Sequence, residues 1–170
     1  MGVHILAGVV WIIITYKYGD WKNWRHYYPT ILFFGFGDLG YNLLFHNNLL
    51  WFYISQFSWL PHSVINLYYI LVIFPCTILL YLPYFPKTLY TQIKYVTFWI
   101  VLYSALEWFF NAAELFGYQH GWNIWWSVLL NCFMFPLLKL HHEKPLIVVP
   151  IFLCLLFFLM YLFNIPLDPM

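Results

Sequence analysis

Charged residues are scarce in this chain: only 8% of its 170 residues are Asp, Glu, Lys or Arg, whereas 64% are hydrophobic. A water-soluble domain of this size cannot bury so much apolar surface, so the composition excludes an ordinary soluble fold. The formal net charge of +1 lacks the basic surface that nucleic acids require, which excludes a nucleic-acid partner. The composition instead predicts an integral membrane protein whose main partner is the lipid bilayer.

Motifs for catalysis and metal binding are also missing. The chain contains neither G-x-S-x-G nor H-E-x-x-H, which argues against standard serine hydrolases and zinc proteases. Cys76, Cys132 and Cys154 are widely spaced within apolar runs, so we predict small core residues rather than disulfides or a zinc site. The sequence identifies no cofactor and no catalytic residue, and it predicts no metal site.

What the chain does have is six apolar runs, each close to the roughly 20 residues that a helix needs to cross a bilayer. The first run lacks a basic start and a small-residue cleavage site, so we interpret it as retained rather than as a signal peptide. We predict an all-α polytopic bundle, a single domain over residues 1–170, with six transmembrane helices at approximately Val3–Tyr18, Tyr27–Phe45, His62–Tyr84, Thr91–Leu115, Trp122–Leu140 and Pro145–Asn164.

The basic residues define an orientation for this bundle. All seven lie in or beside the first, third and fifth connections, and the second and fourth contain none: Lys17, Lys22, Arg25, Lys87, Lys94, Lys139 and Lys144. Basic residues in short loops stay on the cytoplasmic side of a membrane. The alternation therefore predicts that both termini are extracytoplasmic, and Asp168 fits that side.

The second connection, His46–Pro61, reads HNNLLWFYISQFSWLP and carries no formal charge. It is too short to span a bilayer, and it contains five aromatic residues: Trp51, Phe52, Tyr53, Phe57 and Trp59. Aromatic side chains gather at the level of the lipid headgroups. We predict an interfacial segment on the outer surface, helical in part. A lid over an outward-facing cavity is the alternative.

Polar side chains recur with helical spacing on three of the predicted spans. Residues three or four positions apart share one helix face, and a polar face in lipid must turn toward protein or water. All three stripes lie between the midplane and the outer surface, so we predict that they line one outward-facing ligand-binding cavity, closed toward the cytoplasm by apolar packing. The stripes are Asp38, Asn42 and His46; Glu107, Asn111 and Glu114; and Asn123, Ser127 and Asn131.

Asp38 and Glu107 are the residues of this set that most strongly indicate function. A carboxylate at the bilayer centre costs about 2.5–3.5 kcal/mol on insertion scales, whereas Asn and Ser connect helices without a charge. Two facing carboxyl groups can share a proton or hold a cation. The alternative for the neutral residues is structural hydrogen bonding between helices. Gly35, Gly37 and Gly40 surround Asp38 and indicate close helix packing there.

An internal repeat is a further hypothesis. Asp38-x-x-x-Asn42 and Glu107-x-x-x-Asn111 share a pattern, and the interior prolines Pro75 and Pro136 follow in the next helices. This spacing is typical of two parallel hairpin repeats related by an axis along the membrane normal, with chance similarity as the alternative. We expect each proline to kink its helix.

Three sequence blocks carry a family resemblance. They are DWKNWRHYYPTILFFGFGDLGYNLL, VIFPCTILLYLPYFPK and HGWNIWWSVLLNCFMFPLLKLHH. They resemble a family of small multi-pass membrane proteins from spore-forming Gram-positive bacteria. The resemblance implies a multi-pass protein of the bacterial plasma membrane, and it supplies no activity and no site residue.

Several functions fit these features. The first is binding or transport of a small cationic or amphiphilic ligand in the cavity, with carboxylates supplying charge and tryptophans supplying cation–π contacts. The second is a sensory or structural membrane component that acts through helix–helix contact with a partner membrane protein or a second copy. The third is a membrane-embedded lipid-modifying enzyme with Asp38 or Glu107 as general acid or base. The sequence favours a protein that is not an enzyme.

Overall fold

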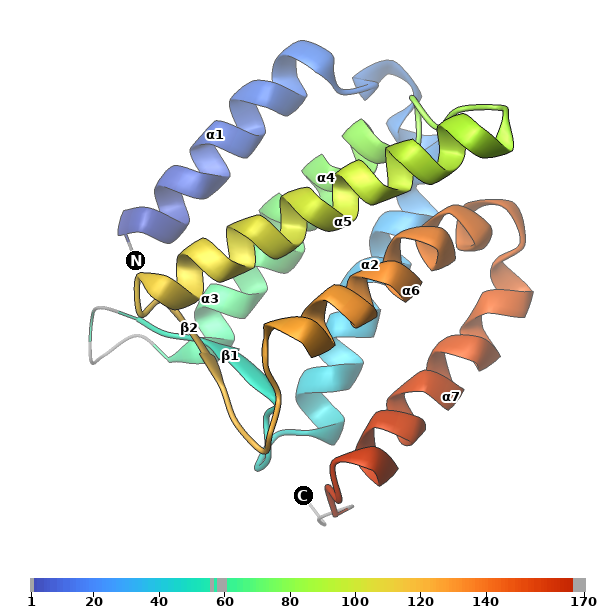
Figure 1. The fold of residues 1–170 in the computed structure, drawn as a ribbon. Helices are drawn as coiled ribbons and strands as arrows, with labels where there is room; N and C mark the ends of the chain where they lie inside the picture. The colour runs from blue at the N-terminus through green and yellow to red at the C-terminus, as the bar shows by residue number, and fades with distance from the viewer. Residues whose placement is uncertain (1, 56, 58–60, 167–170) are drawn as a thin grey trace.

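The computed structural model describes residues 2–55, 57 and 61–166, and it confirms the all-α class. Trp59 and Asp168, which the sequence interpretation places in the outer segment and at the outer C-terminus, lie outside the described residues. The helices are arranged as a bundle with one small two-stranded ribbon (Figure 1). The elements are α1 (Gly2–Tyr18), η1 (Trp21–Asn23), α2 (Trp24–Leu44), β1 (Trp51–Tyr53), α3 (His62–Tyr68), η2 (Tyr69–Ile73), α4 (Phe74–Tyr81), α5 (Leu89–Ala112), β2 (Phe116–Tyr118), α6 (Ile124–Glu143) and α7 (Pro145–Leu162).

The number of membrane-crossing helices differs from the six that the sequence predicts. Within the described residues, four helical segments are long and apolar enough to cross a membrane: His62–Tyr81, α5, α6 and α7. The first two helices pass the same test only as a pair, and they meet at an angle of 90°. Neither helix passes the test alone, because α1 has only 17 residues and α2 carries the polar residues Arg25, Asp38 and Asn42. The structure therefore shows four candidate spans, or five with the bent pair.

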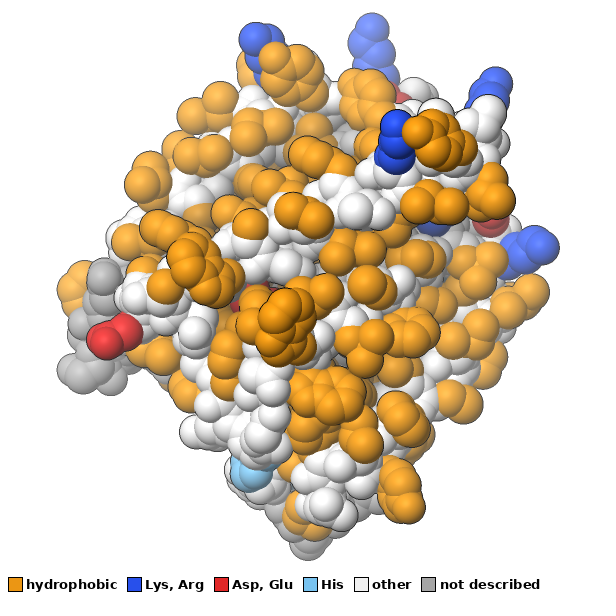
Figure 2. Space-filling view, in the orientation of Figure 1, with side chains coloured by type: hydrophobic (Ala, Val, Ile, Leu, Met, Phe, Trp, Pro, Cys, Tyr) orange, Lys and Arg blue, Asp and Glu red, His pale blue; other side chains and the backbone are white. Residues whose placement is uncertain are grey.

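Basic residues gather at one end of the bundle. The connections α1–α2, α4–α5 and α6–α7 all lie there, and they carry the Lys and Arg residues (Figure 1). In Figure 2 the basic side chains of the visible face lie along its upper and right edges, above a largely apolar surface. Backbone and side-chain contacts tie these connections together: Asp20 N–H donates to the Leu79 carbonyl at 3.2 Å, and the Tyr84 hydroxyl donates to the Tyr18 carbonyl at 2.7 Å.

At the opposite end, the partly helical character predicted for His46–Pro61 is wrong for the described residues of that segment. Its residues form turns and then strand β1, which pairs antiparallel with β2 through Trp51↔Tyr118, Phe52↔Gly117 and Tyr53↔Phe116. Aromatic residues suit a strand, and the pairing satisfies backbone N–H and C=O groups of both strands. The ribbon lies below the ends of α3 and α5 in Figure 1.

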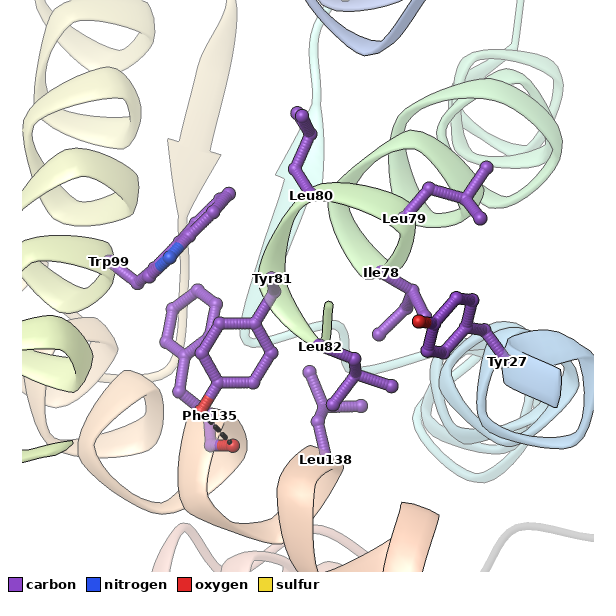
Figure 3. Close-up of a cluster of buried hydrophobic side chains, with 9 residues drawn as sticks. All are labelled: Tyr27, Ile78, Leu79, Leu80, Tyr81, Leu82, Trp99, Phe135 and Leu138. Atoms are coloured by element: carbon purple, nitrogen blue, oxygen red, sulfur yellow. Dashed lines mark hydrogen bonds between the residues drawn. The ribbon is translucent and has the colours of Figure 1, made fainter. Parts of the chain in front are cut away.

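An apolar cluster fills the half of the bundle nearest the basic end. It joins α2, α4, α5 and α6, and its members are Tyr27, Ile78, Leu79, Leu80, Tyr81, Leu82, Trp99, Phe135 and Leu138 (Figure 3). The buried Tyr81 hydroxyl donates to the Phe135 carbonyl at 2.9 Å, the dashed contact in Figure 3.

Pro75 and Gly37 show how single residues shape the helices and their packing. The chain before Pro75 adopts a π-helical turn, η2, which absorbs the missing proline N–H without a sharp break in the span His62–Tyr81. The added Cβ that an alanine would bring at Gly37 lies 3.1 Å from the Phe152 ring, so α7 packs closely on α2 beside Asp38. Of the three cysteines, only Cys76 is buried; Cys132 and Cys154 lie on exposed helix faces, contrary to the predicted core position.

Candidate functional site

A cavity of about 400 Å³ lies between α1, α2, η2, α5, α6 and the β1–β2 ribbon. Four of the predicted site residues line it, one or two from each of three helices: Asp38, Glu107, Ser127 and Asn131. Most of the remaining wall is aromatic, including Trp11, Phe34, Trp51, Tyr53, Tyr69 and Tyr103. The volume falls within the range of roughly 300–1,000 Å³ that is usual for small-molecule sites.

Asp38 is held by two amide side chains. Asn66, from α3, donates its Nδ2 hydrogen to Asp38 Oδ2 at 2.7 Å, and Asn42, one helical turn further along α2, donates at 3.3 Å. The Asn42 amide also donates to the Asp38 backbone carbonyl at 2.8 Å, which fixes its orientation. Both side-chain hydrogen bonds go to Oδ2 of Asp38, so they can form whether or not the other oxygen, Oδ1, carries a proton.

A histidine extends this network toward the ribbon. The Tyr53 backbone N–H donates to His62 Nδ1 at 2.9 Å, so the hydrogen-bond pattern places the ring proton on Nε2. His62 Nε2 then lies 2.9 Å from Asn42 Oδ1 and donates to it. The ribbon, α3 and α2 are therefore connected in one chain that ends at Asp38.

Glu107 is held from the ribbon and from α6. The Tyr118 hydroxyl donates to Glu107 Oε1 at 2.7 Å, and Ser127 interacts with the same carboxyl group. The Ser127 hydroxyl also accepts from the Trp122 indole N–H at 2.8 Å. Burial and the negative charge of Glu107 raise the pKa of Tyr118, so the phenol keeps its proton for this hydrogen bond.

Tyr53 links the two carboxyl groups electrostatically. Burial is the main cause that raises the pKa of Tyr53 well above its ordinary value, followed by Tyr69 and by the charges of Asp38 and Glu107. Asp38 and Glu107 line the same cavity from different helices, and Tyr53 lines it with them.

Neither carboxyl group has a basic partner in the described part of the chain. Within residues 2–55, 57 and 61–166 the ion pair formed is Lys139–Glu143, at 2.9 Å and on the far side of the apolar cluster. The same residues contain no group of three or more His, Cys, Asp or Glu side chains that could hold a metal ion. The cavity therefore offers two carboxyl groups and aromatic faces.

The other predicted site residues serve structural purposes near helix ends. His46 follows the end of α2 and its ring bonds the Leu43 carbonyl at 3.0 Å; Asn111 donates to the Phe116 carbonyl at 2.8 Å. Glu114 is exposed in a turn with φ of 57°, and Asn123 caps α6 by accepting from the Trp125 N–H. Helical phase does not bring these residues to the cavity, because Asn111 lies in the last turn of α5 and the other three lie at or beyond a helix end.

Sequence reasoning did not identify His4 or Tyr118 as site residues. His4 is fully buried beside the cavity, and its ring nitrogens lie 3.1 Å from the Tyr69 hydroxyl and 3.2 Å from the Ile54 carbonyl. A single histidine within the apolar first run was a usable signal. Tyr118 carried no such signal, because its role depends on the pairing of two three-residue strands.

The entrance to the cavity lies on the side of the bundle. Its most exposed lining residues are Leu6, Val10 and Phe109, at 61%, 44% and 54% of full exposure, on α1 and α5. By contrast, Phe116 is buried and the ribbon residues Trp51 and Tyr53 are half-buried, so the ribbon covers the end of the cavity. The lining is therefore most exposed on the side of the bundle, at α1 and α5, rather than at the ribbon end.

Asp38 also faces a second, smaller space of about 120 Å³ between α2, α6 and α7. Phe34, Trp51 and Met134 line both spaces, so Asp38 lies in the wall that separates them. The smaller space is otherwise apolar.

Comparison with known proteins finds no matching family model, no matching curated protein and no matching solved structure.

Proposed function

We propose that this chain is a multi-pass protein of the bacterial plasma membrane that binds or transports a small cationic or amphiphilic ligand in the outward half of the membrane. The observation that carries the proposal is the pair Asp38 and Glu107, two carboxyl groups without a basic partner among the described residues, in one aromatic cavity. A cation bound there would offset the cost of their charge in a poorly solvated site.

Aromatic side chains strengthen this preference for a cation. A cation within about 6 Å of an aromatic ring face gains roughly 0.5–2 kcal/mol, and more than one ring is available here. Trp11, Trp51 and Tyr103 line the same space as the carboxyls. An anionic ligand would meet two acids and no Lys or Arg, because the basic residues lie at the other end of the bundle.

Thermal stabilisation of the purified full chain tests the proposal. Benzyltrimethylammonium, an aromatic-sized quaternary cation, should raise the melting temperature, and benzenesulfonate should not. A ligand at 100 times its Kd contributes about 2.7 kcal/mol to stability. Asp38→Asn and Glu107→Gln should each remove most of this effect, since Asn and Gln can still accept the hydrogen bonds from Asn66 and Tyr118.

Glu114→Gln is the matched control, because Glu114 is an exposed acid outside the cavity lining. It should leave the stabilisation unchanged. If the cation stabilises the Asp38→Asn and Glu107→Gln variants as well as the natural chain, or if the sulfonate is equally effective, the cavity is not a cation site.

A further inference from the structure

The lateral entrance has a chemical consequence that goes beyond cation binding. The residues at the entrance, Leu6, Val10 and Phe109, are all apolar and lie on an exposed helix surface. Figure 2 looks onto the face that contains α1 and α5; apolar side chains cover it, and acidic atoms are visible between them near its centre. A molecule that enters here passes from an apolar surface directly to a carboxyl group.

The wall of the cavity is divided by polarity in the same direction. The α1 side contributes Val3, Leu6, Ala7, Val10 and Trp11, which present no charge. The polar groups come from α2, α5 and α6 on the other sides. This division fits an amphiphile whose charged head lies at the carboxyls and whose chain lies along α1.

Asp38 and Glu107 lie at similar distances from the ribbon ends of their helices. At roughly 1.5 Å per helical residue, Asp38 lies about 9 Å from the end of α2 at Leu44, and Glu107 about 8 Å from the end of α5 at Ala112. Leu6 and Val10 lie roughly 6 and 12 Å from the start of α1. An amphipathic helix at a bilayer surface buries its apolar face to a similar depth, about 5–10 Å into the boundary between headgroups and acyl chains.

We propose that the ligand is a membrane-dissolved, long-chain cationic amphiphile that enters from the outer leaflet between α1 and α5. Its head binds between Asp38 and Glu107, and its chain leaves through the entrance at Leu6, Val10 and Phe109 into the bilayer. A chain longer than the cavity is accommodated because the cavity is open to lipid on this side. This inference rests on the cation site proposed above and adds the class of ligand and its route.

Photolabelling in membranes tests the route. The full chain is reconstituted in phosphatidylcholine vesicles with a hexadecyltrimethylammonium analogue that carries a diazirine in the middle of its chain. Labelling should concentrate on the α1 and α5 peptides that contain Leu6, Val10 and Phe109, and the matching hexadecyl sulfate analogue should not label them. The comparison between the ammonium and the sulfate probes uses the natural chain, so it does not depend on the folding of any variant.

Two α1 variants sharpen the result. Ala7→Trp places a large side chain at the entrance and should remove most of the labelling of α5. Ile13→Trp is the control, because Ile13 is 62% exposed on the same helix and does not line the cavity. It should leave labelling unchanged.

The outcomes separate this inference from the cation site itself. If benzyltrimethylammonium stabilises the chain through Asp38 and Glu107 but the long-chain probe labels only the ribbon or the connections, lateral entry is wrong and the cation site remains. If a Leu6→Cys variant cross-links to a second copy instead of admitting the probe, the entrance is a subunit interface and the inference fails. If neither cation binds in a carboxyl-dependent way, both proposals fail.

Discussion

Removal of one hydroxyl group, by Tyr41→Phe, should loosen the ribbon that covers the cavity. Tyr41 is buried on α2, and its hydroxyl accepts from the backbone N–H groups of Leu50 at 2.8 Å and Trp51 at 2.9 Å. It also donates to the Trp51 carbonyl at 3.1 Å, so all of its hydrogen-bonding capacity is used. Its ring stacks on Trp51 with centroids 3.8 Å apart.

The size of the effect follows from what the variant leaves behind. Phenylalanine keeps the ring stacking, but Leu50 is fully buried and its N–H cannot turn to water. Each backbone N–H group left without a partner costs about 1–3 kcal/mol, so the two N–H groups of Leu50 and Trp51 together cost about 2–6 kcal/mol, and local adjustment recovers part of that cost. We expect a loss of about 2–4 kcal/mol in the free energy of opening of residues 45–53, which accelerates exchange of their amide hydrogens roughly 30- to 700-fold.

Hydrogen exchange by mass spectrometry in detergent micelles measures this change peptide by peptide. The α4 peptides in the apolar cluster should be unaffected, and ligand stabilisation should weaken, since Trp51 and Tyr53 line the cavity. Tyr161→Phe is the control and should change nothing, because Tyr161 is 83% exposed. Unchanged exchange at residues 50 and 51 in Tyr41→Phe would refute the role of this hydroxyl.

Two further predictions concern orientation and packing. In a background without native cysteines, a cysteine at Ser55 should react with an impermeant maleimide in intact cells. A cysteine at Thr88 should react only after permeabilisation. The reverse pattern would overturn the predicted orientation of the bundle. Gly8→Ala should lower the free energy of unfolding by about 1–3 kcal/mol, because the added Cβ would lie 1.6 Å from the Tyr68 hydroxyl. Adding Tyr68→Ala should restore the melting temperature. A Gly8→Ala variant as stable as the natural chain would contradict this helix contact.

The repeat hypothesis stays a prediction, but the order of the elements is similar in the two segments that it pairs. One segment runs α2, β1, α3–α4, and the other runs α5, β2, α6, and their strands pair with each other. Asp38 and Glu107 lie in the C-terminal half of the first helix of each segment, and both line the same cavity. Pairing of the two strands brings the two segments together and so brings the carboxyls to one space.

Sequence reasoning had most difficulty in separating residues in the protein interior from residues on its lipid-facing surface. The interior and the lipid-facing surface of a membrane bundle are equally apolar, so hydropathy does not separate them. Cys132 and Cys154 illustrate this, because both were predicted as core residues and both are exposed. The same limit applies to the lateral entrance, whose residues Leu6, Val10 and Phe109 are ordinary apolar residues in the sequence.

The sequence by itself determined the all-α class, the separation of basic residues to one end and the shared helix faces of Asp38 with Asn42 and of Ser127 with Asn131. These features depend on composition and on a period of 3.6 residues, which are local properties. Tertiary structure alone decided which stripes meet, where they stop and how the cavity opens. His46, Glu114 and Asn123 lie at or beyond helix ends, and Tyr118 reaches Glu107 only through strand pairing. Contacts between distant segments depend on how whole helices pack, and no local pattern encodes that arrangement.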